Sequence, residues 1–289
     1  MPPSKAEVVP SDPHRRYVWV VSRAGDTCVA MTRGEAMLAL VGLLLHVAVG
    51  ADSCATVSLL PAYAHNDYRN RRPLSDALEL GYRGVEADVF RVGNELRVGH
   101  KRSEARAPNT LSRLYLEPLR ARQFVCGYVL ADRAPFFLNI EIKEPDSAAF
   151  SLLLAELDKY PELLPALRVT MVGWWPKPVP GGKPWPPYIR HQLVVQRGAL
   201  TLPADSASIG LISIDYGKVL RWRGSGAIPP ADSASISRAR DLAAIMGVPL
   251  RVHHAPDDGR VYKWLLKEGV TLLGATNLER TRSLLSTRD

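Results

Sequence analysis

Two carboxylates, Glu86 and Asp88, stand two residues apart in the apolar segment "GVEADVF". Side chains two apart in a strand point to the same side, so both carboxylates would leave one face. Glu141 and Lys143 have the same spacing in "FLNIEIKEP". Carboxylates among Val, Ile and Phe are costly to bury unless they are paired or bind a metal. Three of them on two strands predict a hard oxygen site for Mg²⁺ or Ca²⁺.

Two histidines accompany these carboxylates. His65 ends the short segment "AYAH", and His100 follows the segment at residues 96–99. Beside a cation site, two histidines can act as general base and general acid. Taken singly, each feature has a structural interpretation, such as an exposed histidine or a simple pair between Glu141 and Lys143. Their combination favours chemistry.

The elements that must position these residues alternate along the chain. Short apolar runs predict strands at residues 63–65, 84–90, 96–99, 136–142, 169–172, 209–214, 250–253 and 271–274. Helical patterns occupy residues 74–80, 110–119, 147–160, 231–246, 258–268 and 278–285. Strands alternating with helices indicate a parallel sheet, and about eight of them predict an α/β fold, a (β/α)₈ TIM-type barrel. The carboxyl ends of such strands converge on one face, where active sites form.

The order of these residues resembles a known superfamily. The segments that carry the resemblance are "AHNDY", "RPLSDALELGYRGVEADV", "ELRVGH", "TLSRLYLEPL", "LNIEIK", "SIDYGK" and "WLLKEGVTLLGATNLE". They look like the glycerophosphodiester phosphodiesterase and phosphatidylinositol-specific phospholipase C group of barrels. The resemblance runs from about residue 60 to 285 and is nearest to the branch of the altered inheritance of mitochondria protein 6 proteins.

The resemblance implies a role for each matching position. The positions of its metal ligands are Glu86, Asp88 and Glu141, those of its acid–base pair are His65 and His100, and Lys143 matches a lysine near the phosphate. It implies cleavage of a phosphodiester, in many members through attack by a neighbouring substrate hydroxyl. It also implies a lipid-derived or small-molecule substrate.

Three positions depart from the family pattern. Asn66 follows His65 where relatives often have arginine, residues 275–277 read Ala-Thr-Asn rather than ending in Thr-Asp, and His253 replaces a common tryptophan. We expect retained chemistry with an altered substrate pocket. Two alternatives remain open: a non-catalytic barrel that binds an anionic ligand, and a lyase similar to sphingomyelinase D.

Further candidates for substrate contact follow other strands. Asn66, Asp215, Lys218 and Trp222 are candidates to line the pocket, although an ordinary loop ion pair would also explain the pair Asp215 and Lys218. The proline-rich segment at residues 174–188 contains three tryptophans. The segment could cover the mouth of the barrel as a lid or contact a lipid interface, where tryptophan is favoured. The alternative is a stiff loop packed on the barrel.

The N-terminal region is predicted to lie outside the barrel. An apolar run at residues 36–49 follows Arg33 and precedes small residues, as in a secretory signal peptide. We interpret residues 1–30 as a non-native or disordered extension, residues 31–55 as a signal peptide or signal anchor, and residues 60–289 as the barrel domain. A buried amphipathic helix is the remaining alternative. A signal peptide and a signal anchor both predict export to the periplasm, cell surface or medium.

Composition restricts the partners. The chain has 289 residues and a formal net charge of +8, and residues 1–60 carry five basic and five acidic side chains. The whole excess therefore belongs to residues 61–289, which favours anionic partners. No basic run with interleaved aromatics stands out, so we expect no nucleic acid. Peripheral contact with a membrane is compatible with this charge. The three cysteines lack metal-binding spacing.

Overall fold

The computed structural model describes residues 17–21, 28–32, 54, 56–176, 185–196 and 206–286. The chain divides into two compact units, Met1–Ala55 and Thr56–Asp289. In the first unit, β1 (Tyr17–Val21) pairs antiparallel with β2 (Cys28–Thr32). The apolar run interpreted as a signal peptide lies outside the described residues. None of the helices in the described part of the chain has the length and apolar character needed to span a membrane.

The second unit is a closed barrel of eight parallel strands. They are β3 (Ala62–Ala64), β4 (Gly84–Val92), β6 (Phe136–Ile142), β7 (Leu167–Val172), β8 (Ile189–Val195), β9 (Ile209–Asp215), β10 (Leu250–His253) and β11 (Leu272–Ala275). Strand β3 pairs with both β11 and β4, which closes the barrel. The predicted TIM-type barrel is therefore confirmed.

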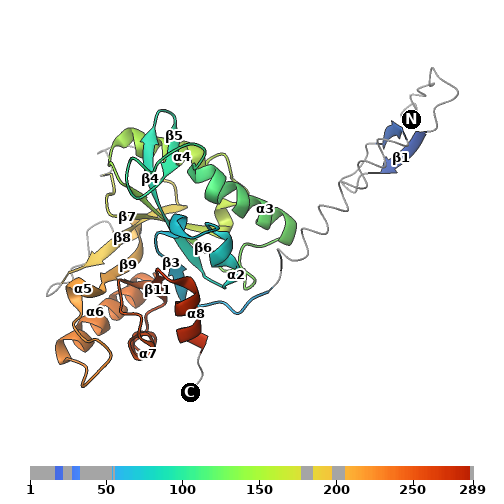
Figure 1. Cartoon of the computed structure of the whole chain (residues 1–289). Coiled ribbons are helices and arrows are strands. Elements are labelled where there is room, and N and C mark those ends of the chain that lie inside the picture. Colours follow the sequence, from blue (N-terminus) through green and yellow to red (C-terminus); the bar gives the residue numbers. More distant parts are fainter. Residues whose placement is uncertain are drawn as a thin grey trace. The chain divides into compact units, whose positions relative to one another are not determined.

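Helices and short turns connect the strands and surround them (Figure 1). The helices are α2 (Ser75–Glu79), α3 (Glu117–Cys126), α4 (Ser147–Leu157), α5 (Tyr216–Val219), α6 (Pro230–Met246), α7 (Gly259–Lys267) and α8 (Leu278–Ser286). Shorter helical segments are η1 (Asp67–Arg69), η2 (Ser112–Leu116), η3 (Leu164–Ala166) and η4 (Ser206–Ser208). The apolar faces of these helices pack on the strands, so that the core lies between the two layers.

One predicted barrel strand is wrong and one was missed. The segment predicted as a strand at residues 96–99 forms β5 (Glu95–Val98), which pairs antiparallel with the end of β4 and lies outside the barrel. Strand β8 was not predicted. It carries three consecutive polar residues, Arg190, His191 and Gln192, and its pairing with β9 is irregular between the last two. A bulge of this kind breaks the alternation on which strand prediction depends.

Strand β4 shows how the barrel separates apolar from polar side chains. Val85, Ala87 and Val89 are fully buried in the hydrophobic core, whereas Glu86 and Asp88 alternate with them and leave the other face of the strand. The apolar set packs outward under the helices, and the carboxylates face the barrel interior. The fold therefore places two acidic groups where water is scarce.

Candidate active site

Three carboxylates converge at the carboxyl ends of β4 and β6. Asp88 pairs directly with Glu141 in the sheet register, and Glu86 lies two residues before Asp88 on the same face of β4. Each of the three offers one oxygen, and these oxygens all lie within 4.8 Å of one another. We call these three residues the carboxylate cluster. Like charges held this close repel one another unless cations compensate them.

Arg251, on β10, compensates Glu86. Its Nη2 donates a 2.5 Å hydrogen bond to Glu86 Oε2, and its Nε donates to the Tyr63 hydroxyl at 2.6 Å. Burial by itself would raise the pKa of Glu86, but the charge of Arg251 and a bond from His65 outweigh burial and lower it to about 2. Gly274 makes room for this arrangement, because a Cβ there would lie 2.7 Å from the Tyr63 hydroxyl.

Asp88 is fully buried, and its two oxygens have different environments. Oδ2 accepts a hydrogen bond from the Tyr68 hydroxyl at 2.7 Å and lies 3.0 Å from His100 Nδ1. Lys143 Nζ is 3.5 Å from the same oxygen. Oδ1 is buried and has no hydrogen-bond partner among the described residues. A buried carboxylate oxygen without a partner is costly, so this atom fits the position of a cation ligand.

Glu141 completes the cluster beside Lys143. The lysine Nζ donates to Glu141 Oε1 at 3.1 Å. Burial and the charge of Asp88 raise the pKa of Glu141 despite this bond. Burial opposes the charge on Lys143, but Asp88 and Glu141 together raise its pKa, so it stays protonated. The cluster therefore offers three carboxylates, one of which has an oxygen without a partner among the described residues. Carboxylate oxygens of this kind suit a hard divalent cation.

The two predicted acid–base histidines are each held by a different member of the cluster. His65 Nε2 lies 3.3 Å from Glu86 Oε1, and His100 Nδ1 lies 3.0 Å from Asp88 Oδ2. His65 follows β3 and His100 follows β5, so separate strands deliver them. A carboxylate beside a histidine fixes the orientation of its ring.

Asp215 lies in a second group with two histidines. In the register of β9 and β10 it pairs with His253, whose Nε2 is 3.9 Å from Asp215 Oδ2. His254 Nδ1 is 3.3 Å from Asp215 Oδ1. We call these three residues the histidine cluster. Burial, followed by the charge of Arg251, lowers the pKa of His253 to about 3. The His65 ring lies between the two clusters, 5.1 Å from the His254 ring.

The other predicted substrate-contact residues have local partners. Asn66 has a left-handed backbone (φ 52°), and its Oδ1 lies 2.9 Å from the Tyr68 hydroxyl. Lys218 Nζ pairs with Asp215 Oδ2 at 3.2 Å. The Trp222 indole donates to the Ser225 carbonyl at 2.9 Å and packs edge-on against Trp264. Asn66 and Lys218 adjoin the two clusters, whereas the indole of Trp222 is occupied in packing. The roles of all three stay predictions.

The tryptophans of the proline-rich segment pack together against α4. Trp174, Trp175 and Trp185 each make an edge-on contact with Phe150, with ring centroids 4.8–6.4 Å apart. Trp175 also stacks on His191. Residues 177–184, between the tryptophans, lie outside the described residues. These contacts agree with the interpretation of a loop packed on the barrel, and contact with a lipid interface stays a prediction.

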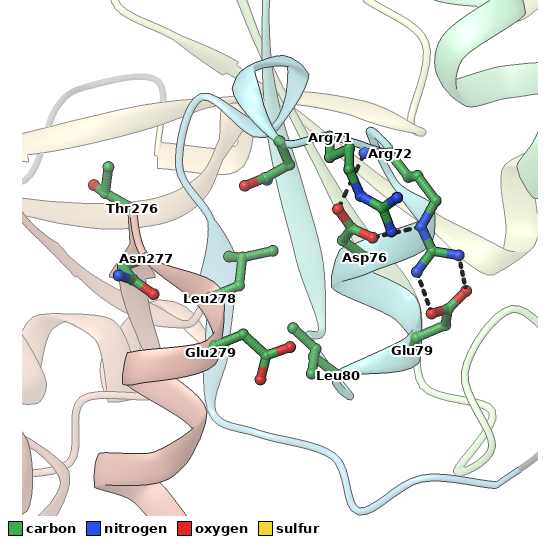
Figure 2. A pocket seen from close by; sticks show the side chains of 10 residues that line it. Arg71, Arg72, Asp76, Glu79, Leu80, Thr276, Asn277, Leu278 and Glu279 are labelled. Carbon is green, nitrogen blue, oxygen red and sulfur yellow. Dashed lines mark hydrogen bonds and ion pairs between the residues drawn. The ribbon is translucent and has the colours of Figure 1, made fainter.

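A pocket of about 440 Å³ lies near the start of α8 and α2, and Figure 2 shows its lining. Arg72 is engaged by Asp76 and Glu79 in this pocket. Asn277 Oδ1 accepts from the backbone N–H of Arg280 and so caps α8. Neither cluster contributes to the lining. The departure from the family pattern at residues 275–277 therefore lies in a helix cap at this pocket.

Sequence reasoning missed Tyr68, Arg251 and His254. Tyr68 stands inside the motif "AHNDY", so its position was noted but its contact with Asp88 was not. Arg251 interrupts an apolar strand in "PLRVH", and a lone basic residue in a buried strand indicates a buried acidic partner. His254 gave a weaker signal, a second histidine directly after a strand end. Which strand lies opposite each of these residues depends on barrel closure.

Comparisons with known proteins agree with this geometry over part of the chain. Residues 51–123 match the model of the AIM6-like phosphodiesterase domain. Over 63 residues the chain is 44% identical to altered inheritance of mitochondria protein 6 of Eremothecium gossypii, which covers 21% of this chain and 16% of that protein. It is 39% identical over 66 residues to a homolog of that protein from Arthroderma benhamiae, 21% of each chain.

The matched segment spans about a fifth or less of these curated relatives. The family model covers His65, Glu86, Asp88 and His100 but ends before Glu141. The resemblance read from the motifs is confirmed over that segment, which is similar to the AIM6-like phosphodiesterase domain.

A solved structure supports the fold. The crystal structure described as a glycerophosphodiester phosphodiesterase from Galdieria sulphuraria aligns with a TM-score of 0.50 and 16% identity, covering 79% of this chain and 99% of that one. At this identity the match shows the shared barrel. The chemistry has to be argued from the residues of this chain.

Proposed function

We propose that this chain is an exported, metal-dependent phosphoric diester hydrolase that acts on a lipid-derived or other small phosphodiester. The observation that carries the proposal is the pairing of His65 with Glu86 and of His100 with Asp88, at 3.3 and 3.0 Å, around one carboxylate cluster. Two proton-transfer groups beside one cation site are what phosphodiester cleavage requires.

The carboxylate cluster fits a hard divalent cation, and Mg²⁺ or Ca²⁺ would be held by Glu86, Asp88 and Glu141. Glu86 can give Oε1, because Arg251 engages its Oε2. Asp88 can give Oδ1, which has no partner in the described part of the chain. When bound, such a cation neutralises negative charge on phosphate oxygens.

The remaining residues of the site handle protons and charge. One histidine takes the proton of the attacking hydroxyl or water, and the other protonates the leaving alkoxide. Lys143 stays protonated beside the cluster and adds positive charge near the phosphate oxygens. Tyr68 donates a 2.7 Å hydrogen bond to Asp88 Oδ2 and so holds the carboxylate with Oδ1 turned away from the tyrosine.

Export is part of the proposal. Cys54 and Cys126 are both disulfide-bonded. Disulfides persist in oxidising compartments such as the periplasm or the cell exterior and are rare in reducing ones. This agrees with the signal-like apolar run at residues 36–49, with the signal segment ending before Cys54. A basic barrel and an anionic lipid headgroup are also compatible, so peripheral contact with a membrane remains a prediction.

A non-catalytic anion-binding barrel is the second candidate, and Asn66 favours it. The glycerophosphodiesterases that the sequence resembles often have arginine at this position, and here the Asn66 amide oxygen lies 2.9 Å from the Tyr68 hydroxyl instead. Without that arginine, the phosphate has one cation fewer. Tight binding of phosphodiesters with no turnover of a broad panel, with metal supplied, would support this candidate over the enzyme.

The test is hydrolysis of a chromogenic phosphodiester by the full chain, with added Mg²⁺ or Ca²⁺ and with EDTA. We expect activity to be lost in EDTA and to fall by about 10²–10⁴ in His65→Ala and in His100→Ala. The matched control is His191→Gln, since His191 stacks on Trp175 away from both clusters. Unchanged activity in EDTA and in both histidine variants would contradict the proposal. A cyclic phosphate as the end product would identify a lyase.

A further inference from the structure

The histidine cluster has the composition and the spacing of a second metal site. Asp215 ends β9, His253 ends β10, and His254 is the next residue. Each offers one ligand atom, and these atoms all lie within 4.8 Å of one another. Asp215 is nearly buried, at 12% side-chain exposure, whereas His254 is 52% exposed. The cluster therefore opens to solvent and an ion can reach it.

The distances agree with ligands that surround one ion. A tetrahedral zinc site with ligands at about 2 Å places neighbouring ligand atoms roughly 3.3 Å apart. His254 Nδ1 lies 3.3 Å and His253 Nε2 lies 3.9 Å from oxygens of Asp215. The two histidines face different oxygens of Asp215, so an ion would draw together ligand atoms that lie within 4.8 Å of one another.

Two further features hold the histidines in place. Ser213 Oγ lies 3.3 Å from His253 Nδ1, so His253 presents its other nitrogen to Asp215. A metal-binding histidine usually uses its second nitrogen in this way. His254 has a left-handed backbone with φ 57°, an unfavourable conformation for a residue other than glycine. Strained backbones of this kind cluster at functional sites.

We propose that Asp215, His253 and His254 form a second cation site, which takes a borderline divalent ion of the Zn²⁺ class. Two imidazoles and one carboxylate suit such ions, whereas the all-oxygen carboxylate cluster suits Mg²⁺ or Ca²⁺. The two sites flank His65, whose ring lies 6.3 Å from His253 and whose Nε2 lies 3.3 Å from Glu86. The inference goes beyond the proposed hydrolase and does not depend on it.

Lys218 is the group that competes with a cation for Asp215. Its Nζ pairs with Asp215 Oδ2 at 3.2 Å, but its side chain is 82% exposed. The lysine end of the pair is exposed to water, so the lysine can turn to solvent when an ion binds. The lysine therefore competes with the ion for one oxygen, while Asp215 Oδ1 already faces His254.

The experiment is a titration of Zn²⁺ into the chelator-treated full chain, followed by calorimetry and by analysis of bound metal after gel filtration. Excess Mg²⁺ is present throughout to occupy the carboxylate cluster. We expect one Zn²⁺ per chain, with affinity reduced at least roughly tenfold in His254→Gln and in Asp215→Asn. His254 is half exposed, so His254→Gln should fold, and its thermal unfolding is recorded alongside.

Controls separate this site from its neighbours. His191→Gln should bind Zn²⁺ like the wild type, because His191 lies outside the cluster. Lys218→Met should bind Zn²⁺ more tightly, since it removes the competing ammonium group. Three outcomes would overturn the inference. The first is an unchanged Zn²⁺ affinity in His254→Gln and Asp215→Asn, and the second is weaker Zn²⁺ binding in Lys218→Met. The third is a loss of Zn²⁺ binding in His65→Ala while His254→Gln and Asp215→Asn keep it. Inorganic phosphate binding that depends on His254, with no Zn²⁺ bound, would also overturn it and indicate an anion site.

Discussion

The carboxylate cluster and the histidine cluster both lie at strand ends of one barrel, but their charges are compensated differently. Glu86 and Asp88 are almost completely buried, and Arg251, itself buried, neutralises Glu86 from across the barrel. Asp215 instead pairs with Lys218, whose side chain is 82% exposed. One cluster is therefore part of the folded core, and the other is attached to its edge.

This difference separates stability from binding. A buried ion pair that loses one partner leaves a charge without compensation in a medium that solvates it poorly. An exposed pair that loses one partner is rescued by water. Changes in the carboxylate cluster should therefore act on folding and on metal binding together, whereas changes in the histidine cluster should act on binding almost alone.

The largest expected effect is that of Arg251→Met. The substitution leaves Glu86 buried beside Tyr63 without its cation, and removing one partner of a buried pair costs about 3–5 kcal/mol. The free energy of unfolding is measured by urea denaturation in the presence of EDTA. The double variant Glu86→Leu/Arg251→Met is the matched control and should regain most of this loss. A loss below about 1 kcal/mol in the single variant would show that the pair is not essential to the core.

Acid should weaken the same pair. The pKa of Glu86 is lowered from 4.5 to about 2 in the folded chain, so its ionised form stabilises the fold above pH 4.5. That stability disappears as the pH falls from 4.5 towards 2, by roughly 3 kcal/mol in total. Urea denaturation of metal-free protein at successive pH values measures the slope. The free energy of unfolding of Glu86→Gln, which cannot ionise at this position, should fall less steeply with pH in this window. Equal slopes for the variant and the wild type would contradict the assignment.

Metal should stabilise the two clusters independently. A ligand that binds only the folded state at 100 times its dissociation constant adds about 2.7 kcal/mol. We expect Mg²⁺ or Ca²⁺ to raise the unfolding temperature of the wild type and of His254→Gln equally. Asp88→Asn should abolish the effect, because it removes the negative charge of this ligand and replaces one of its oxygens by an NH₂ group. If His254→Gln also abolished it, the two clusters would be one site.

The sequence allowed the fold to be predicted because most barrel strands carry a local signal. Strands β4, β6 and β9 are rich in Val, Ile, Leu and Phe, and their boundaries were predicted to within two residues. Strand β8 carries its polar residues in succession and is bulged, so no local pattern marks it. Residues 96–99 look like a barrel strand, and only the pairing partner shows that they form a hairpin with β4.

The site was predictable where its residues share one strand. Glu86 and Asp88 are related by a two-residue spacing, and Glu141 follows from the same rule on β6. The partners of these residues come from β10 and from η1, which are distant in sequence, so Arg251 and Tyr68 became visible only when the barrel closed. Asp215 was noticed as a strand-end acid, but its two histidines required the register of β9 and β10.

The smallest expected effect distinguishes the members of the carboxylate cluster from each other. Burial and Asp88 raise the pKa of Glu141, so its ionised form destabilises the metal-free fold at neutral pH. Glu141→Gln should therefore increase the free energy of unfolding in EDTA by about 0.5–1 kcal/mol, while the stabilisation by Mg²⁺ is lost. The control Glu144→Gln, in an exposed pair with Arg102, should keep the stabilisation by Mg²⁺. A metal-free Glu141→Gln variant less stable than the wild type would mean that Lys143 compensates Glu141 fully, as Arg251 compensates Glu86.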